Sequence, residues 1–210
     1  MSRPAHGAAR DLRELVIASN NPGKLREIGE IVHPLGIGIV PQSAHGVPEA
    51  AEPHDTFIEN ALAKARHASR WTGLPALADD SGICVDALGG APGVRSARYA
   101  SEGDAALSQD ERNNRKLLAA LADVEARGAH YYCVIVLVRH PGDPQPLIAE
   151  AEWRGVVLRE PRGAGGFGYD PLFLLPGLGL TAAELAPDAK NRVSHRGQAL
   201  ALLAEKLRRP

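Results

Sequence analysis

Residues 131–138, Tyr-Tyr-Cys-Val-Ile-Val-Leu-Val, form a continuous apolar run that decides the class of fold. A run of β-branched and other apolar side chains without polar interruption is typical of a central strand buried on both faces of a sheet. Residues 148–157 have the pattern of its neighbouring strand. The sequence therefore predicts a sheet with residues 131–138 near its centre.

The N-terminal part of the chain predicts the order strand, loop, helix. Residues 15–18, Leu-Val-Ile-Ala, have the length expected of a buried strand. Residues 19–23 supply turn and N-cap residues, and apolar side chains then recur at helical spacing over residues 25–32. A second strand over 37–40 leads into a polar loop over 41–55, and loops of this length are often functional.

A second helix is predicted to begin after Thr56. Thr56 and Glu59 form a capping-box pattern, and an apolar face follows as far as Gly73. The other predicted elements are short strands over 76–78, 83–85 and 172–175, and amphipathic helices over 105–126 and 194–207. Strands and helices that alternate in this way indicate an α/β protein.

Composition indicates one domain with no strong electrostatic preference. The 210 residues fit a single domain over 13–210 behind a flexible polar tail over 1–12. With 24 basic and 25 acidic residues, the net charge of −1 gives no global attraction to nucleic acid or an anionic membrane. The apolar runs are too short to span a bilayer. Cys84 and Cys133 lie in apolar stretches, which favours core positions in a reducing compartment. We therefore expect a soluble, cytoplasmic protein.

An acidic turn, Asp79-Asp80-Ser81-Gly82, is the first candidate for chemistry. It lies between two short apolar stretches, so at least one carboxylate is expected at a strand end. Paired carboxylates at such a place suit a hard divalent cation or a general base. The alternative is a local Asx turn, because Asp, Ser and Gly are common turn formers.

The loop Ser19-Asn20-Asn21-Pro22-Gly23-Lys24 is a candidate phosphate site. It joins a strand to a helix, where backbone N–H groups and the helix dipole favour anions, and Lys24 adds a positive charge. It is not a Walker A loop, because Ala18 replaces the first glycine and Leu25 stands where Ser or Thr should be. The alternative is an ordinary capped turn.

Residues 163–168, Gly-Ala-Gly-Gly-Phe-Gly, have the GxGxxG spelling of a dinucleotide-binding loop. That interpretation fails on context, because a strand rather than a helix is predicted to follow. The glycines instead suggest a loop that packs closely on a ligand, with Phe167 or Tyr169 offering a face for stacking a nucleobase. The alternative is a flexible connector that contains two core aromatics.

Basic side chains gather before and at the start of the last predicted helix. Ser194 can serve as its N-cap, and His195 and Arg196 project from an end that favours anions. Cations there oppose the helix dipole, so an outside partner is expected for them. Lys190 lies in a polar stretch where simple exposure is the alternative.

Taken together in order, six motifs resemble the Ham1/inosine triphosphatase family, and within it the bacterial branch that hydrolyses dITP and XTP. They are Ser-Asn-Asn-Pro-Gly-Lys at 19–24, Thr-Phe-Ile-Glu-Asn-Ala at 56–61, Ala-Asp-Asp-Ser-Gly at 78–82, Gly-Gly-Ala-Pro-Gly-Val-Arg-Ser-Ala-Arg-Tyr at 89–99, Gly-Gly-Phe-Gly-Tyr-Asp-Pro at 165–171 and Ser-His-Arg-Gly-Gln-Ala at 194–199. The resemblance implies an elongated, two-lobed α/β fold around a mixed central sheet with flanking helices. It also implies a nucleotide cleft between the lobes and a homodimer.

The resemblance also implies roles for individual residues. Asp80 would be the catalytic acid-base residue and a ligand of Mg2+, with Glu52 or Glu49 as the second carboxylate and Glu52 preferred from its spacing to Thr56. Asp79 would share the metal or orient its neighbour. The implied substrate-binding residues are Ser19, Asn20, Asn21, Pro22, Gly23, Lys24, Ser81, Phe167, Gly168, Tyr169, Asp170, Lys190, His195 and Arg196.

The implied activity is hydrolysis of noncanonical purine nucleoside triphosphates, namely ITP, dITP and XTP, to the monophosphate and pyrophosphate. Such an enzyme would cleanse the nucleotide pool. Two alternatives remain, an NTPase that releases orthophosphate and a purine nucleotide sensor without catalysis.

Overall fold

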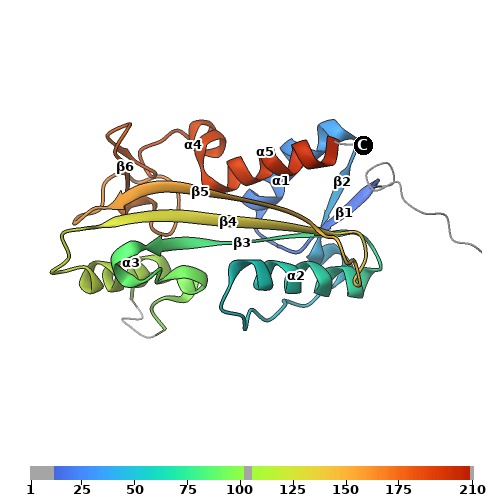
Figure 1. Ribbon diagram of the computed structural model, residues 1–210, viewed down its shortest axis with the longest axis horizontal. Coiled ribbons are helices and arrows are strands. Elements are labelled where there is room, and N and C mark those ends of the chain that lie inside the picture. Colours follow the sequence, from blue (N-terminus) through green and yellow to red (C-terminus); the bar gives the residue numbers. More distant parts are fainter. Residues whose placement is uncertain (1–11, 102–105, 209–210) are drawn as a thin grey trace, which may run out of the picture. The chain divides into compact units, whose positions relative to one another are not determined.

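The computed structural model describes residues 12–101 and 106–208, and their strands form one mixed seven-stranded sheet (Figure 1). The strands are β1 (Glu14–Ile17), β2 (Gly38–Pro41), β3 (Ala76–Val85), β4 (Gly128–Val138), β5 (Leu147–Val157), β6 (Phe173–Leu175) and β7 (Leu180–Thr181). The α-helices are α1 (Pro22–Val32), α2 (Phe57–Thr72), α3 (Gln109–Ala120), α4 (Pro187–Val193) and α5 (His195–Arg208). Helices that alternate with strands in this way confirm the predicted α/β class.

The sheet has the order β2-β1-β3-β4-β5-β6-β7. Strand β1 runs parallel to β2 and β3, whereas β6 runs antiparallel to β5 and β7. The run that predicted a central strand is β4, the fourth of the seven. Its side chains from Cys133 to Val138 are each at most 1% exposed. An unbroken apolar strand therefore lies where both of its faces are covered, as the sequence predicted.

Of the described residues, one compact unit combines 12–80, 134–150 and 199–208. Within it, the apolar residues 15–17 of β1 are almost completely buried, so the short run is a core strand. Figure 1 shows α2 on one side of the strands of this unit and α1 on the other. Thr56 caps α2 by accepting a hydrogen bond from the Glu59 N–H, as the capping box predicted.

The second compact unit combines the described residues 81–101, 106–133 and 151–198. Its core gathers aromatic and aliphatic side chains from β3, β4, β5, β6 and α3, among them Ile83, Leu117, Tyr131, Trp153 and Phe173. The strands β3, β4 and β5 each contribute residues to both units. The single domain predicted over residues 13–210 stays a prediction.

Helix α3 is shorter than the predicted helix over 105–126. Ser108 and Glu111 form a complete capping box, so the helix begins at Gln109. It ends at Ala120, and the buried guanidinium of Arg127 donates hydrogen bonds to the carbonyls of Leu121 and Val157. The predicted start at Ala105 lies outside the described residues. The C-terminal error arose because Arg127 ties the end of the helix to β5, which helical spacing does not reveal.

The acidic turn is also a correction. Residues 79–82 lie inside one continuous strand, β3, rather than in a turn between two short strands. The strand passes through without a break because Gly82 packs directly on the Gly93 carbonyl and the Ser96 hydroxyl, where a Cβ would not fit. A glycine that looks like a turn former is therefore needed here for close packing.

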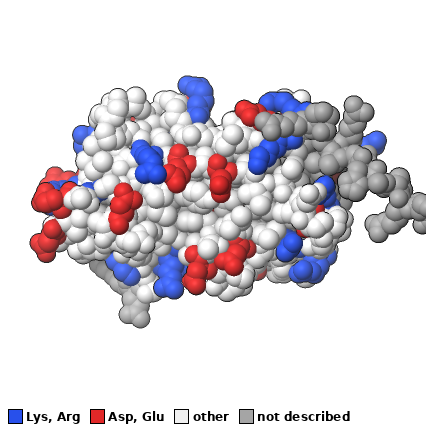
Figure 2. All heavy atoms as spheres, viewed as in Figure 1, with Lys and Arg blue, Asp and Glu red and all other residues white. Residues whose placement is uncertain are grey.

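The surface charge, the helices and the two cysteines bear on the properties that the composition predicted. On the face shown in Figure 2, acidic and basic side chains are interspersed and neither sign forms a continuous field. In the part of the chain that the structure describes, every helix is too short or too polar to cross a membrane. Cys133 is buried and Cys84 is half-buried, and neither forms a disulfide with a residue that the structure describes.

The connection between β4 and β5 is held by a buried carboxylate, Asp143. Its oxygens accept hydrogen bonds from the Arg139 backbone N–H at 3.0 Å, from Arg139 Nε at 2.8 Å and from the Gln145 N–H at 2.9 Å. These hydrogen bonds, above all those from Arg139, hold the pKa of Asp143 well below its usual range. The ionised form is therefore the one that stabilises the fold.

Asp143→Asn should lower the free energy of unfolding at pH 7 by about 2–3 kcal/mol, because Arg139 loses its counter-ion. A depressed folded pKa contributes stability above the unfolded pKa of about 3.9, and that stability is lost as the pH falls toward the folded pKa. The gap between wild type and variant should therefore be constant above about pH 5 and narrow below about pH 4. Urea unfolding at several pH values measures it, with exposed Asp123→Asn as the matched control. A gap that widens on acidification contradicts the assignment.

Candidate active site

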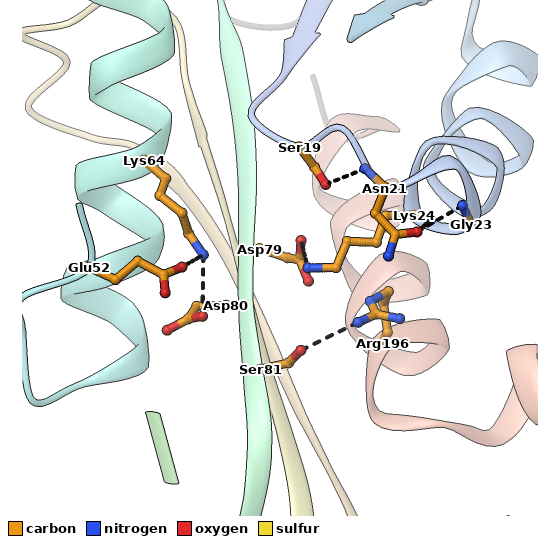
Figure 3. Close-up of polar contacts among 10 residues, drawn as sticks. All are labelled: Ser19, Asn21, Gly23, Lys24, Glu52, Lys64, Asp79, Asp80, Ser81 and Arg196. Atoms are coloured by element: carbon orange, nitrogen blue, oxygen red, sulfur yellow. Dashed lines mark hydrogen bonds and ion pairs between the residues drawn. The ribbon is translucent and has the colours of Figure 1, made fainter. Parts of the chain in front are cut away.

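The two aspartates of β3 point to opposite faces of the strand. Side chains alternate along a strand, so Asp79 and Asp80 cannot project together. Figure 3 shows the consequence, with Asp79 directed toward Lys24 and Asp80 toward Lys64. The Lys24 Nζ lies 2.8 Å from Asp79 Oδ1, and the Lys64 Nζ lies 3.2 Å from Asp80 Oδ1. The neighbouring carboxylates therefore belong to two different charge clusters.

Lys64 joins Asp80 to Glu52. Its ammonium lies 2.6 Å from Glu52 Oε1 as well as 3.2 Å from Asp80 Oδ1, and its side chain is only 13% exposed. Burial alone would lower the pKa of Lys64, but Asp80, Glu52 and Asp79 together raise it above its usual value. Lys64 is therefore a firmly charged cation between two acidic groups.

Asp80 has the opposite electrostatic balance. Burial raises the pKa of its carboxyl, Lys64 lowers it, and the negative charges of Glu52 and Asp79 raise it further, so the net direction is upward. A carboxylate with a raised pKa is a better proton acceptor than an exposed one. The environment of Asp80 thus suits the role of a general base.

The loop before α2 presents Glu52 to this cluster. Asn60, completely buried in α2, accepts a hydrogen bond from the His54 N–H and donates one to the His54 carbonyl, both at 3.1 Å. This double contact fixes the backbone two residues after Glu52. Of the two glutamates left open by the sequence, Glu52 is the one that shares Lys64 with Asp80.

The carboxylates of Asp80 and Glu52 suit Mg2+ as two of its oxygen ligands. Asp80 Oδ2 is buried and makes no hydrogen bond to the described part of the chain, so one hard oxygen donor is available. Among residues 12–101 and 106–208, no three His, Cys, Asp or Glu side chains are grouped as a metal site. Mg2+ is commonly held by only one or two carboxylates, with phosphate oxygens and water supplying the rest.

The loop Ser19–Lys24 is a capped helix start. The Asn21 side chain accepts hydrogen bonds from the N–H groups of Gly23 at 2.9 Å and Lys24 at 3.2 Å, and Pro22 is the first residue of α1. Asn20 Oδ1 accepts from the Ser43 N–H, and Ser19 Oγ accepts from the Asn21 N–H. An anion at this helix end would meet the Lys24 ammonium and would compete with Asn21 for the backbone donors.

The glycine-rich loop exposes one aromatic ring and buries the other. Phe167 is 61% exposed, and the Lys190 ammonium lies 4.7 Å from its ring centroid. Tyr169 is 3% exposed and donates a hydrogen bond to the Ser96 carbonyl at 2.8 Å. Of these two aromatics, Phe167 is therefore the one with an exposed ring, whereas Tyr169 is a core residue that fixes the loop, and the predicted stacking of a nucleobase stays a prediction.

Asp170 and Gly168 anchor the same loop. The buried Asp170 carboxylate accepts hydrogen bonds from the Phe167 N–H at 2.8 Å and from the Lys190 ammonium. Gly168 donates to the Asp110 carboxylate at 2.7 Å and accepts from the Asn114 amide at 3.0 Å. Phe167 thus sits on a loop that is fastened on both sides.

The start of α5 presents His195 and Arg196, as the sequence predicted. Ser194 Oγ accepts from the Gly197 N–H at 3.2 Å and caps the helix. Arg196 donates to Ser81 Oγ at a long 3.4 Å, which Figure 3 shows. Gly197 packs so closely on the Asn191 carbonyl that a Cβ would not fit, so its backbone fixes the approach of α4 to α5.

Comparison with known proteins agrees with the motifs. Residues 15–206 match the sequence model of the Ham1 family.

The chain belongs to the Ham1 family.

Curated relatives are similar to this chain over nearly their whole length. The dITP/XTP pyrophosphatase of Ralstonia nicotianae is 64% identical over 197 residues, which cover 94% of this chain and 98% of the relative. The dITP/XTP pyrophosphatase of Nitrosomonas europaea is 64% identical over 196 residues, which cover 93% and 95%.

Solved Ham1 structures share the fold. A HAM1 protein from Coxiella burnetii superposes with a TM-score of 0.87 at 49% identity, and the match covers 92% of this chain and 98% of that one. A nucleoside-triphosphatase / dITP/XTP pyrophosphatase from Mycobacterium abscessus gives a TM-score of 0.72 at 42% identity, covering 90% and 98%. The resemblance in the motifs therefore extends to the whole Ham1 fold.

In the cluster of Glu52, Lys64 and Asp80, Lys64 is the residue that the sequence motifs did not indicate. Residues 61, 65 and 68 form the buried stripe of α2, and position 64 lies in the same stripe at helical spacing. A lysine inside an apolar stripe requires a buried counter-ion. That signal was available in the sequence.

Proposed function

We propose that this Ham1 protein hydrolyses the noncanonical purine nucleoside triphosphates ITP, dITP and XTP to the monophosphate and pyrophosphate. The observation that carries the proposal is the buried Asp80 carboxylate, which is linked through Lys64 to Glu52 and has one oxygen without a hydrogen bond to any described residue. The names of the relatives support the substrate class, since those aligned over nearly their full length are dITP/XTP pyrophosphatases.

The proposed chemistry uses Asp80 as the base. Its carboxylate accepts a proton from a water that attacks the α-phosphorus, the bond from the α-phosphorus to the bridging oxygen breaks, and pyrophosphate leaves. Lys64 and Lys24, each already next to a carboxylate, supply positive charge against the phosphates. Mg2+, held by Asp80 and Glu52, would neutralise charge on the phosphate oxygens.

Recognition of the base falls to residues of the second unit. Arg196 only donates hydrogen bonds, and His195 donates through a ring N–H, so the pair favours a purine edge that presents acceptors. A 6-keto group is such an acceptor, whereas the amino group of adenine would leave these donors unpaired. Phe167 offers an exposed ring for stacking, and Lys190 and Asp170 hold it in place.

A nucleotide panel tests the proposal. ITP, dITP, XTP, GTP and ATP are incubated with Mg2+, and pyrophosphate and orthophosphate are measured separately. We expect pyrophosphate with ITP, dITP and XTP, and kcat/KM for ATP lower by at least about 10²-fold. Orthophosphate as the first product would identify a different NTPase, and tight binding of ITP without turnover would identify a nucleotide sensor. Similar efficiency with ATP and ITP would refute base recognition alone.

The family resemblance also supports a homodimer and a cytoplasmic location. Light scattering at several protein concentrations tests the dimer, and a monomer at all of them contradicts it. Cell fractionation tests the location.

A further inference from the structure

Tyr131 of β4 is a buried aromatic residue that contacts two of the predicted substrate-binding residues, His195 and Asp170. Its ring stacks on the His195 imidazole, with centroids 4.8 Å apart and planes inclined by 7°. Its hydroxyl donates to Asp170 Oδ1 over a long 3.4 Å. One buried side chain therefore reaches both the start of α5 and the glycine-rich loop.

Asp170 links Tyr131 to Phe167 and Lys190, because its carboxylate contacts all three residues. One of its oxygens, Oδ2, already accepts from the Phe167 N–H and the Lys190 ammonium, while Oδ1 is the atom that Tyr131 contacts. The carboxylate is 3% exposed, so these protein donors, rather than a ligand, surround it. Asp170 thus holds Phe167 by its backbone N–H and Lys190 by its side-chain ammonium.

The environment of Tyr131 fixes its rotamer and its protonation. Phe173 packs edge-on at 4.7 Å between centroids, and Trp153 lies stacked at 6.4 Å. Burial and the adjacent Asp170 charge raise the pKa of Tyr131 well above its usual value, so the hydroxyl keeps its proton and acts as the donor. The ring is consequently a rigid support for the groups around it.

We propose that Tyr131 is a positioning residue for purine recognition: its ring sets the plane of the His195 imidazole, and its hydroxyl orients the Asp170 carboxylate that anchors Phe167 and Lys190. This inference rests on the proposed function, because it takes His195 and Phe167 as residues that contact the base. Tyr131 itself touches no substrate. Its loss should weaken selection of the base and leave the phosphate chemistry near Asp80 unchanged.

The test compares Tyr131→Phe, which removes only the hydroxyl, with Tyr131→Leu, which also removes the ring. Calorimetric binding of IMP, a ligand that is not turned over, should weaken about threefold in the first variant and about tenfold in the second. KM for ITP should rise by similar factors while kcat changes less than about twofold, the pattern of lost uniform binding. Tyr132→Phe is the matched control, since the neighbouring side chain leaves the other face of β4.

A nuclear magnetic resonance readout separates this inference from the proposed function. The His195 ring protons lie in the shielding region of the Tyr131 ring, so their resonances should move downfield in Tyr131→Leu and stay in Tyr132→Phe. Absence of turnover by wild type would sink the proposed function, and IMP binding and the His195 resonances would still report on Tyr131. Wild-type IMP affinity in both Tyr131 variants overturns the inference. A fall of kcat by these factors in the two variants, with KM for ITP unchanged, overturns it as well.

Discussion

Asp80→Asn should lower kcat for ITP by about 10³-fold while the protein keeps its fold. The amide has the size of the carboxylate but cannot accept the proton of the attacking water, and it is a poorer ligand for Mg2+. Because burial raises the pKa of Asp80 in the native state, its ionised form does not stabilise the fold. Thermal unfolding should therefore stay close to wild type or improve, and pyrophosphate release should be nearly absent.

Asp79→Asn is the matched control, because it makes the same change one residue away on the opposite face of β3. Asp79 pairs with Lys24, so this variant should change KM for the triphosphate more than kcat. It should also leave the half-saturating concentration of Mg2+ within about twofold of wild type, since the carboxylate points away from Asp80 and Glu52. Near-normal turnover in Asp80→Asn, or an equal loss of kcat in both variants, would refute the assignment of the base.

Lys64→Met should slow turnover and at the same time tighten the binding of Mg2+. Loss of the ammonium removes positive charge that acts on the phosphates, so kcat should fall by about 10²-fold. The same loss leaves Glu52 and Asp80 without the cation that lies between them. Their attraction for a divalent cation should increase, and half-saturation by Mg2+ should occur at a concentration about threefold to tenfold lower. Turnover measured across a Mg2+ titration gives both quantities.

Lys116→Met is a suitable control for Lys64→Met. Lys116 donates to the Tyr99 carbonyl and lies over the Tyr99 ring, and it belongs to neither charge cluster. Both constants should stay at wild-type values in this variant. Weaker rather than tighter binding of Mg2+ by Lys64→Met would show that Lys64 holds the two carboxylates in place for the metal instead of competing with it.

Much of the fold could be predicted because local patterns and tertiary structure agree. The unbroken apolar run of β4 has both faces buried, and the capping residues Thr56 and Ser194 begin the helices they predicted. The strand β7, of two residues, is too short for periodicity to reveal. The limits of α3 depend on Arg127, a residue outside the helix, and helix periodicity carries no information about such a contact.

The sequence motifs indicated most members of the candidate site, with Lys64 as the exception, but not how they pair. The residue types of the site stand out in the sequence, namely Asp79, Asp80, Lys24 and Glu52. The turn propensity of residues 79–82, however, concealed the strand that directs the two aspartate side chains to opposite faces. Glycine at position 82 has two interpretations, a turn or a close approach, and only the packing of Ser96 against it decides between them. Tyr169 was ambiguous for a similar reason, because a buried tyrosine and a stacking tyrosine look alike in sequence.

Strand β3 also sets how this chain tolerates changes of length. Insertion or deletion of one residue within β3 ahead of Asp79 would turn every later side chain of the strand to the opposite face. Asp79 would then face Lys64, and Asp80 would face Lys24. The connection that contains Pro141 and Pro146 lies between strand ends, and a change of length there shifts no side chain of β3. Variation in length should therefore be absent from residues 76–82, because the alternation of side chains along β3 keeps Asp79, beside Lys24, and Asp80, beside Lys64, on opposite faces of the strand.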